Sequence, residues 1–218
     1  MVLPEGQQYG DWRAHPTGPF IADVSAWSTT LRRGRTAPQW LSDANSYRTS
    51  PDSAALLRDG IVLATLTRQP PDQSDPRWSG DVAVTEEVRA QMNLDATLPE
   101  SLEPVVPERL SGRWVPAGGV GRNAPRLPFL AFATDGRWTG SDGCNNSSGR
   151  WRIGAGGVLL STHGAVTLAW CNDMVHTSGW LQASSLAGLD RDVLVMLDGA
   201  GTEVARLDPA SAPDEPRT

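Results

Sequence analysis

The feature that most constrains the fold of this chain is a series of short apolar segments separated by turn-forming residues. In the C-terminal half these segments are 127–132, 137–140, 149–153, 157–161, 165–170, 193–197 and 203–207. Asp135-Gly136 and Gly199-Ala200-Gly201 supply turn chemistry between neighbouring segments. Segments this short, bounded by such residues, are typical of β-strands joined by hairpins. The sequence therefore predicts a mainly β (α+β) fold, with a small antiparallel barrel or sandwich.

Two short helices and two irregular stretches interrupt this pattern. Residues 178–186 predict a helix packed on the sheet, and 85–92 predict a second helix with Thr85 as its N-cap. Proline cannot donate to a sheet ladder, so the Pro- and acid-rich stretches 69–75 and 98–107 predict linkers.

The chain also resembles itself at a spacing of 139 to 141 positions. Gly10-Asp11-Trp12-Arg13 matches Gly149-Arg150-Trp151-Arg152, and Trp40-Leu41 matches Trp180-Leu181. We therefore expect a truncated, degenerate copy of the β unit in 1–68, a linker with a short helix in 69–109, the intact unit in 110–209 and a disordered tail in 210–218. Chance similarity between tryptophans and glycines is the alternative interpretation.

The first copy has no counterpart of residues 129–138. A β unit without its first strands leaves an open sheet edge, which is prone to pair with other strands. Either the second copy covers that edge or residues are missing before Met1. The latter interpretation predicts a start codon further upstream and an export signal.

The segment 132–145 resembles the signature of the META/HslJ-like domain family. That signature is an apolar strand, an Asp-Gly turn, a polar strand that ends in glycine, and then Gly-Cys-Asn. The residues that match the family motif are Gly112, Trp114, Asp135, Gly136, Gly140, Gly143, Cys144, Asn145, Gly149, Trp151, Thr167 and Cys171. Trp170 departs from the pattern, and the first copy lacks both cysteines.

The resemblance implies a β-rich domain of bacterial envelope-associated or secreted proteins, often lipoproteins, with a loose link to stress and drug tolerance. It implies no catalytic residues and no cofactor. We therefore expect a non-catalytic envelope module, not an enzyme, that binds an unknown protein, peptide or glycan partner. A small apolar-ligand carrier using the barrel interior and a thiol-dependent hydrolase are the alternatives. If Met1 is the true start, the protein is cytoplasmic.

Composition narrows the possible partners. The net charge is −6 and the pI is about 5.0, so the chain lacks the basic field of a nucleic-acid binder. No apolar stretch approaches the roughly 18 residues of a transmembrane helix.

The two cysteines, Cys144 and Cys171, predict a disulfide if the chain is exported and buried thiols if it is not. His163 and His176 do not form the short clips with these cysteines that organise most zinc sites, so no metal is expected.

Four residues form a possible ligand surface: Asn145, Asn146, Trp138 and Trp151. Indole faces stack on flat ligands, and amide side chains grip polar ones. The competing interpretation places the indoles in the core and uses the asparagines to hold a turn.

Overall fold

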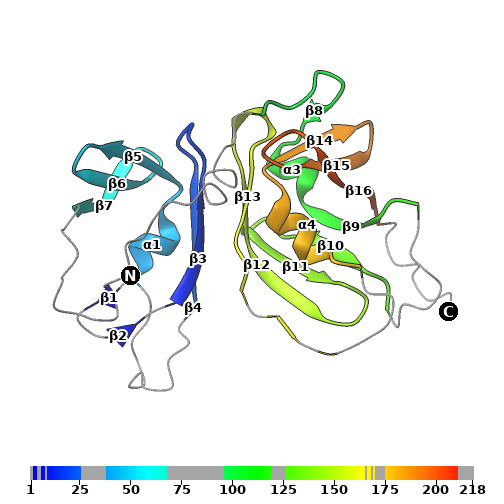
Figure 1. The fold of residues 1–218 in the computed structure, drawn as a ribbon, viewed down its shortest axis with the longest axis horizontal. Coiled ribbons are helices and arrows are strands. Elements are labelled where there is room, and N and C mark those ends of the chain that lie inside the picture. The colour runs from blue at the N-terminus through cyan, green and yellow to red at the C-terminus, as the bar shows by residue number, and fades with distance from the viewer. Residues whose placement is uncertain are drawn as a thin grey trace.

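A computed structural model describes residues 2–3, 6–7, 9–25, 38–67, 96–118, 126–164, 166–167, 169 and 175–210. The described chain is mostly antiparallel β-sheet, which confirms the predicted β-rich class (Figure 1). It forms an N-terminal unit, residues 2–67, and a C-terminal unit, residues 96–210. None of the described helices is long and apolar enough to cross a membrane.

The N-terminal unit consists of short hairpins and one helix. Its elements are β1 (Val2–Leu3), β2 (Gly6–Gln7), β3 (Tyr9–Ala14), β4 (Phe20–Ser25), α1 (Gln39–Asp43), β5 (Ser46–Ser50), β6 (Ser53–Arg58) and β7 (Ile61–Thr67). The pairs β1-β2 and β3-β4 and the triplet β5-β6-β7 form separate small sheets. The bridge Pro19↔Ser46 joins the start of β4 to the start of β5. The unit is therefore an arc of five strands, in the order β3-β4-β5-β6-β7.

The C-terminal unit contains the larger sheet. Its elements are β8 (Glu103–Pro104), α3 (Pro107–Leu110), β9 (Gly112–Pro116), β10 (Phe129–Phe132), β11 (Arg137–Ser141), β12 (Asn146–Ile153), η2 (Ala155–Gly157), β13 (Leu159–Ser161), α4 (Thr177–Ala183), β14 (Leu186–Asp190), β15 (Val193–Leu197) and β16 (Glu203–Pro209). Among the described residues nine strands pair in the order β13-β12-β11-β10-β9-β16-β15-β14-β8.

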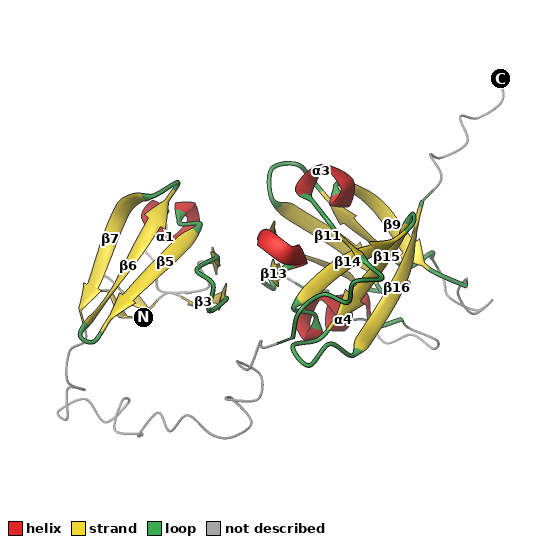
Figure 2. Ribbon diagram, turned by 90° about the horizontal axis from the view of Figure 1, so that it is seen from above, coloured by secondary structure: helices red, strands yellow, loops and turns green. Residues whose placement is uncertain are grey.

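This sheet curls until its far strands meet (Figure 2). Val158, just before β13, bridges Leu186 at the start of β14, and the Leu159 N–H donates to the Ser185 carbonyl at 2.8 Å. Since β13 and β14 stand near opposite ends of the strand order, these contacts turn the sheet into a barrel.

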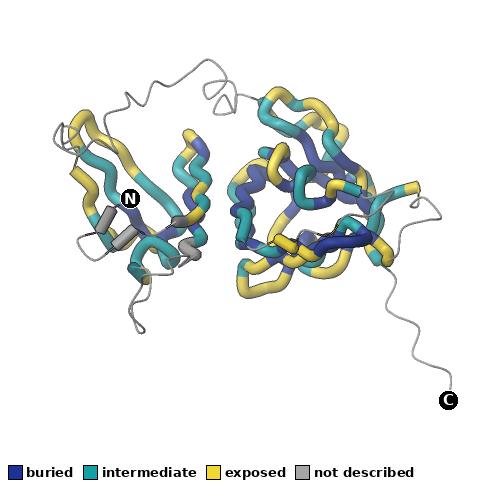
Figure 3. The backbone as a smooth tube through the Cα atoms, turned by 60° about the horizontal axis from the view of Figure 1, so that its bottom comes forward, coloured by how far each residue is buried: buried dark blue, intermediate teal, exposed yellow. Residues whose placement is uncertain are grey.

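Apolar side chains fill the inside of the barrel. The buried cluster is Val105, Leu110, Trp114, Leu130, Phe132, Trp138, Trp151, Leu159, Leu181, Ala187, Leu189, Leu194, Met196, Ala205 and Leu207. Leu181 comes from α4, so the helix adds to the same core. Figure 3 shows the contrast with β5–β7, which are mostly half-buried or exposed. The packed interior gives no support to a carrier of apolar ligands inside this barrel.

Most expected strands of the C-terminal half are confirmed, but β14 was not predicted. The expected helix 178–186 ends at Ala183, and Leu186 already belongs to β14. This strand is buried on both faces, so it lacks the alternation that marks a half-exposed strand. Leu98 and Leu102 also pack directly over Gly188, where a Cβ atom would lie 2.9 Å from the Leu102 Cβ.

The expected linker 98–107 is instead part of the C-terminal unit. Glu103 and Pro104 pair with β14 as an edge strand, a position that tolerates proline. Val105 is buried in the barrel core, and Leu98 and Leu102 pack against a second cluster. The prediction of a linker over 98–107 is wrong because the apolar side chains between the prolines pack against the core of the C-terminal unit. The expected helix 85–92, the stretch 69–75, most of the segment 165–170 and the tail 211–218 lie outside the described residues.

Candidate binding site

The turn between β11 and β12 holds the Gly-Cys-Asn sequence. The Asp142 Oδ1 atom accepts hydrogen bonds from the backbone N–H of Cys144 at 2.7 Å and of Asn145 at 2.5 Å. Gly143 has a φ of +95°, a value that glycine adopts without strain. The Arg126 guanidinium donates to the Cys144 carbonyl. These contacts explain why Asp, Gly, Cys and Asn follow one another in this turn.

Asn145 is a buried connector rather than a ligand-binding side chain. Its Oδ1 accepts from the Ala169 N–H at 2.5 Å and from the Thr167 hydroxyl at 3.3 Å. Its Nδ2 donates to the Ala169 carbonyl at 3.0 Å. The amide therefore ties the turn to residues 167–169, and the prediction that Asn145 belongs to a ligand surface is wrong. Asn146 is exposed and remains available to a ligand.

Trp138 and Trp151 also lie in the core, with 0% and 6% of their surface exposed. The Trp138 indole N–H donates to the Thr162 carbonyl at 2.9 Å, and that of Trp151 to the carbonyls of Ala133 and Arg137. Rings that are buried with their donors satisfied cannot stack on a ligand. The prediction that they form a ligand surface is therefore wrong, and the core interpretation holds for both.

Gly149 of the motif is explained by the same packing. A Cβ atom on Gly149 would lie 1.9 Å from the Thr162 carbonyl oxygen and 2.6 Å from the Trp138 Nε1. Real Cβ contacts are never this short, so only glycine lets Trp138 reach Thr162 across β12. The glycine and the tryptophan of the motif thus form one packing unit.

Cys144 is buried, and no described cysteine is a free thiol. Cys171 lies outside the described residues, so its pairing with Cys144 stays a prediction. Among the described residues there is no group of three or more His, Cys, Asp or Glu side chains that could hold a metal ion.

The closed antiparallel sheet, the Gly-Cys-Asn turn and the Gly149–Trp138 packing lie in one part of the chain, and residues 108–211 match the META domain family. This part of the chain is a META domain. The match confirms the resemblance of this segment to the META/HslJ-like family. Comparison with curated proteins and with solved structures gives no match.

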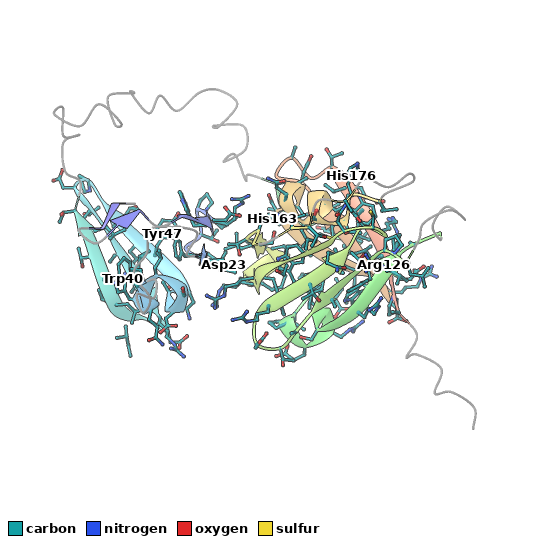
Figure 4. All side chains as sticks on the ribbon, turned by 90° about the horizontal axis from the view of Figure 1, so that it is seen from below. Asp23, Trp40, Tyr47, Arg126, His163 and His176 are labelled. Carbon is teal, nitrogen blue, oxygen red and sulfur yellow. The ribbon has the colours of Figure 1, made fainter. Side chains whose placement is uncertain are left out.

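The META domain meets the N-terminal unit along β12 and β13. Arg150 of β12 donates through Nη1 to the carbonyls of Ala22 at 3.2 Å and Ser42 at 2.5 Å. The His163 N–H donates to the Asp11 Oδ2 at 2.9 Å. Figure 4 shows His163 and Asp23 on the two sides of this junction. Each of these three hydrogen bonds joins a side chain of one unit to a backbone atom of the other.

His163 is a half-buried titratable group at the junction. Its Nε2 is buried without a hydrogen-bond partner among the described residues, and its ring meets Trp138 edge-on at 5.6 Å. Burial lowers the pKa of His163, while the Asp11 carboxylate partly opposes this effect. The neutral imidazole is therefore the favoured form in the folded protein.

A pocket of about 500 Å³ opens beside the junction. Its wall consists of Thr17, Gly18, Pro19, Asn45, Ser46, Tyr47, Arg48, Leu57 and Gly60 from the N-terminal unit and Arg152, Ile153 and Gly154 from the META domain. Sequence analysis did not find this pocket, because the two units that form it are far apart along the chain.

Arg152 is the unusual residue in this pocket. Its Nε is buried and has no hydrogen-bond partner among the described residues, in contrast to the paired Arg150 two residues earlier. Burial lowers the pKa of Arg152, and the neighbouring Arg150 lowers it further. A half-buried guanidinium with an unpaired Nε is costly, because that donor loses water without regaining a hydrogen bond. Such a group suits an anionic oxygen ligand, which would restore those bonds.

Proposed function

We propose that this protein is a non-catalytic binding module of the cell envelope that holds an anionic group, a carboxylate or a phosphate, in the junction pocket. The buried Nε of Arg152, which has no hydrogen-bond partner among the described residues, carries the proposal. Arginine presents a planar fork of N–H donors that matches two oxygens of a carboxylate or phosphate. A peptide or glycan partner that bears such a group fits the pocket in size and charge.

The rest of the pocket wall supports an oxygen-rich ligand. Arg48 adds a second positive charge at the pocket, and Asn45, Ser46 and Tyr47 offer polar side chains. Asn45 is held in place by Asp59, whose Oδ1 accepts from the Asn45 Nδ2 at 2.7 Å. The nearby Asp59 charge makes Arg152 easier to keep protonated, so the pocket retains its positive charge. Placement of polar groups by neighbours is typical of pre-formed sites.

The test is a titration of the whole chain with inorganic phosphate and, separately, with N-acetylglycine. The backbone amide resonances of the pocket residues Ile153 and Gly154, which both chains contain, are followed by NMR. We expect a saturable shift with one or both probes, and its loss in the R152Q variant. R137Q is the matched control, because Arg137 is an exposed arginine outside the pocket. If neither probe gives a saturable change, or if R152Q binds like the unchanged chain, the proposed site does not exist.

The envelope assignment rests on the META domain and on the expected disulfide between Cys144 and Cys171. Disulfides persist in oxidising compartments and are rare in the cytosol. Protein isolated from its native host and denatured without reductant should therefore contain no free thiol by colorimetric titration. Two free thiols per chain would contradict both the bond and the location.

A further inference from the structure

Strand pairs of the N-terminal unit recur in the META domain 139 to 141 positions later. The matched pairs are Trp12↔Ala22 with Trp151↔Ser161, and Ala54↔Leu66 with Leu194↔Leu207. The pairs β6-β7 and β15-β16 also shift register at the matched step, after positions 56 and 196. Irregularities of this kind are kept within families, so the two units can be compared position by position.

The backbone contact that joins β4 to the start of β5 matches in the same way. The Phe20 N–H donates to the Asn45 carbonyl at 3.1 Å. At the matched positions the Leu159 N–H donates to the Ser185 carbonyl at 2.8 Å. Positions 18–20 and 45–57 of the N-terminal unit are therefore the counterparts of positions 157–159 and 185–197 of the META domain.

Most of the junction pocket wall lies at these matched positions. The matched residues are Gly18 and Gly157, Pro19 and Val158, Ser46 and Leu186, Tyr47 and Ala187, and Leu57 and Leu197. In the META domain this surface is covered by residues 96–105, the covering segment, since Ala96, Leu98 and Leu102 pack against its buried cluster. The surface that binds the covering segment in one unit is therefore the pocket wall in the other.

The covering segment makes one turn and then runs beside β14. The Leu102 N–H donates to the Pro99 carbonyl at 2.9 Å and closes the turn. Positions 103 and 104 then pair with β14. A peptide of this shape packs its side chains on the surface while its backbone follows a strand, which is a common mode of peptide recognition. The META domain thus shows what kind of chain this surface binds.

One difference between the two matched surfaces changes their charge. A Cβ atom on Gly188 would lie 2.9 Å from the Leu102 Cβ, so glycine lets Leu102 lie directly on β14. The matched residue of the N-terminal unit is Arg48, which lines the pocket. Arg152 lines the same pocket from the META domain. A side chain at the place of Leu102 therefore meets guanidinium groups, which bind a carboxylate rather than a leucine.

The place of Leu98 stays apolar. In the META domain a Cβ atom on Gly157 would lie 3.4 Å from Leu98, and the matched residue Gly18 is again a glycine. Leu57, which lines the pocket, is 3% exposed, as is its counterpart Leu197. A ligand that follows the covering segment therefore places an apolar side chain here and an acidic side chain four positions later.

We propose that the junction pocket binds a short peptide segment of a partner protein, which follows the course of the covering segment. Its apolar side chain lies over Gly18 and Leu57, and its acidic side chain meets Arg48 and Arg152. The inference rests on the proposed function, which assigns an anionic group to Arg152, and it identifies that group as a peptide carboxylate.

The first test is a calorimetric titration of the whole chain, at low salt, with two acetylated and amidated peptides. Both have the sequence of residues 96–105, with Leu102→Glu in one and Leu102→Gln in the other, so they differ by one charge. We expect the glutamate peptide to bind at least about five-fold more tightly, because it adds an ion pair. R48Q and R152Q should each reduce this preference and the double variant should abolish it, whereas the control R137Q leaves it unchanged. Equal affinity for both peptides, or a preference that survives in the double variant, would overturn the proposal.

N-acetylglycine distinguishes failure of this inference from failure of the proposed function. If it shifts the amide signals of Ile153 and Gly154 but neither peptide binds, the pocket holds an anion and the peptide proposal is overturned. If N-acetylglycine, phosphate and both peptides all fail to bind, the proposed function falls as well.

The direction of the bound peptide gives a second test. Ala96 lies against Gly201, where a Cβ atom would be 3.6 Å from the Ala96 Cβ, and the matched residue is Gly60 of the pocket wall. Position 103 pairs with position 189, which is matched by Thr49. A nitroxide at the amino end of the glutamate peptide should therefore broaden the NMR amide signal of Gly60 more than that of Thr49, and a nitroxide at the carboxyl end should do the reverse. The opposite order would overturn the proposed course of the peptide.

Discussion

Trp12 and Trp151 stand at matched places on paired strands, yet one is open to solvent and the other is buried. The same difference holds for Leu66 and Leu207. The sequence around each pair is similar, so the local pattern does not decide whether a side chain joins a core. Closure decides it, because the strands that cover Trp151 and Leu207 have no described equivalent in the N-terminal unit.

The largest expected effect comes from truncating the two tryptophans. W151A should destabilise the META domain by about 3–5 kcal/mol, the usual range when a buried aromatic side chain is removed. W12A in the same chain should cost less than about 1 kcal/mol, since Trp12 is mostly exposed. Urea denaturation measures both free energies of unfolding. Equal costs would break the comparison between an open and a closed unit.

The next effect tests the packing across β12. G149A should destabilise the META domain by about 3 kcal/mol, because a methyl group would collide with the Thr162 carbonyl and the Trp138 ring. G179A is the control: Gly179 lies in α4 with ordinary contact distances, and alanine favours helix. The same denaturation assay applies, and a neutral G149A would show that Trp138 does not need the glycine.

These contacts also show how far the sequence alone could lead. Asp135-Gly136 and the alternating apolar residues of β10 and β11 predicted strands correctly, because their signals are local. The order of β9 beside β16 and the strand β14 depend on residues that are distant in sequence, and the pattern did not predict them. The junction pocket depends on contacts between two units, so no single motif could reveal Arg152.

A smaller effect separates the two arginines of β12. R150Q should destabilise the chain by about 1–2 kcal/mol, because Arg150 donates hydrogen bonds to the carbonyls of Ala22 and Ser42 across the junction. R152Q should instead stabilise the chain by up to about 1 kcal/mol, since it removes a half-buried cation whose Nε has no hydrogen-bond partner among the described residues. Thermal unfolding of both variants in phosphate-free buffer checks the opposite signs. If both variants destabilise, Arg152 has a structural role.

The smallest expected effect concerns pH and the coupling of the units. The pKa of His163 lies below its ordinary value of 6.5 in the folded chain, so the unfolded chain binds the proton first as pH falls. Stability should therefore decrease as pH drops below about 6.5 and level off below the folded pKa. H163Q should remove this part of the pH dependence, with H176Q as the control. Denaturation curves between pH 5 and 8 measure the free energy of unfolding at each pH. If its pH dependence is unchanged in H163Q, groups other than His163 cause it.

The most direct test of the unequal closure of the two units is residue-resolved amide exchange of the whole chain. In β12 the amides pair with β11 on one side and β13 on the other, so nearly every amide should be protected. In β3 only the amides that face β4 should be protected, giving an alternating pattern from Tyr9 to Ala14. Uniform protection along β3, equal to that of β12, would contradict an open N-terminal unit.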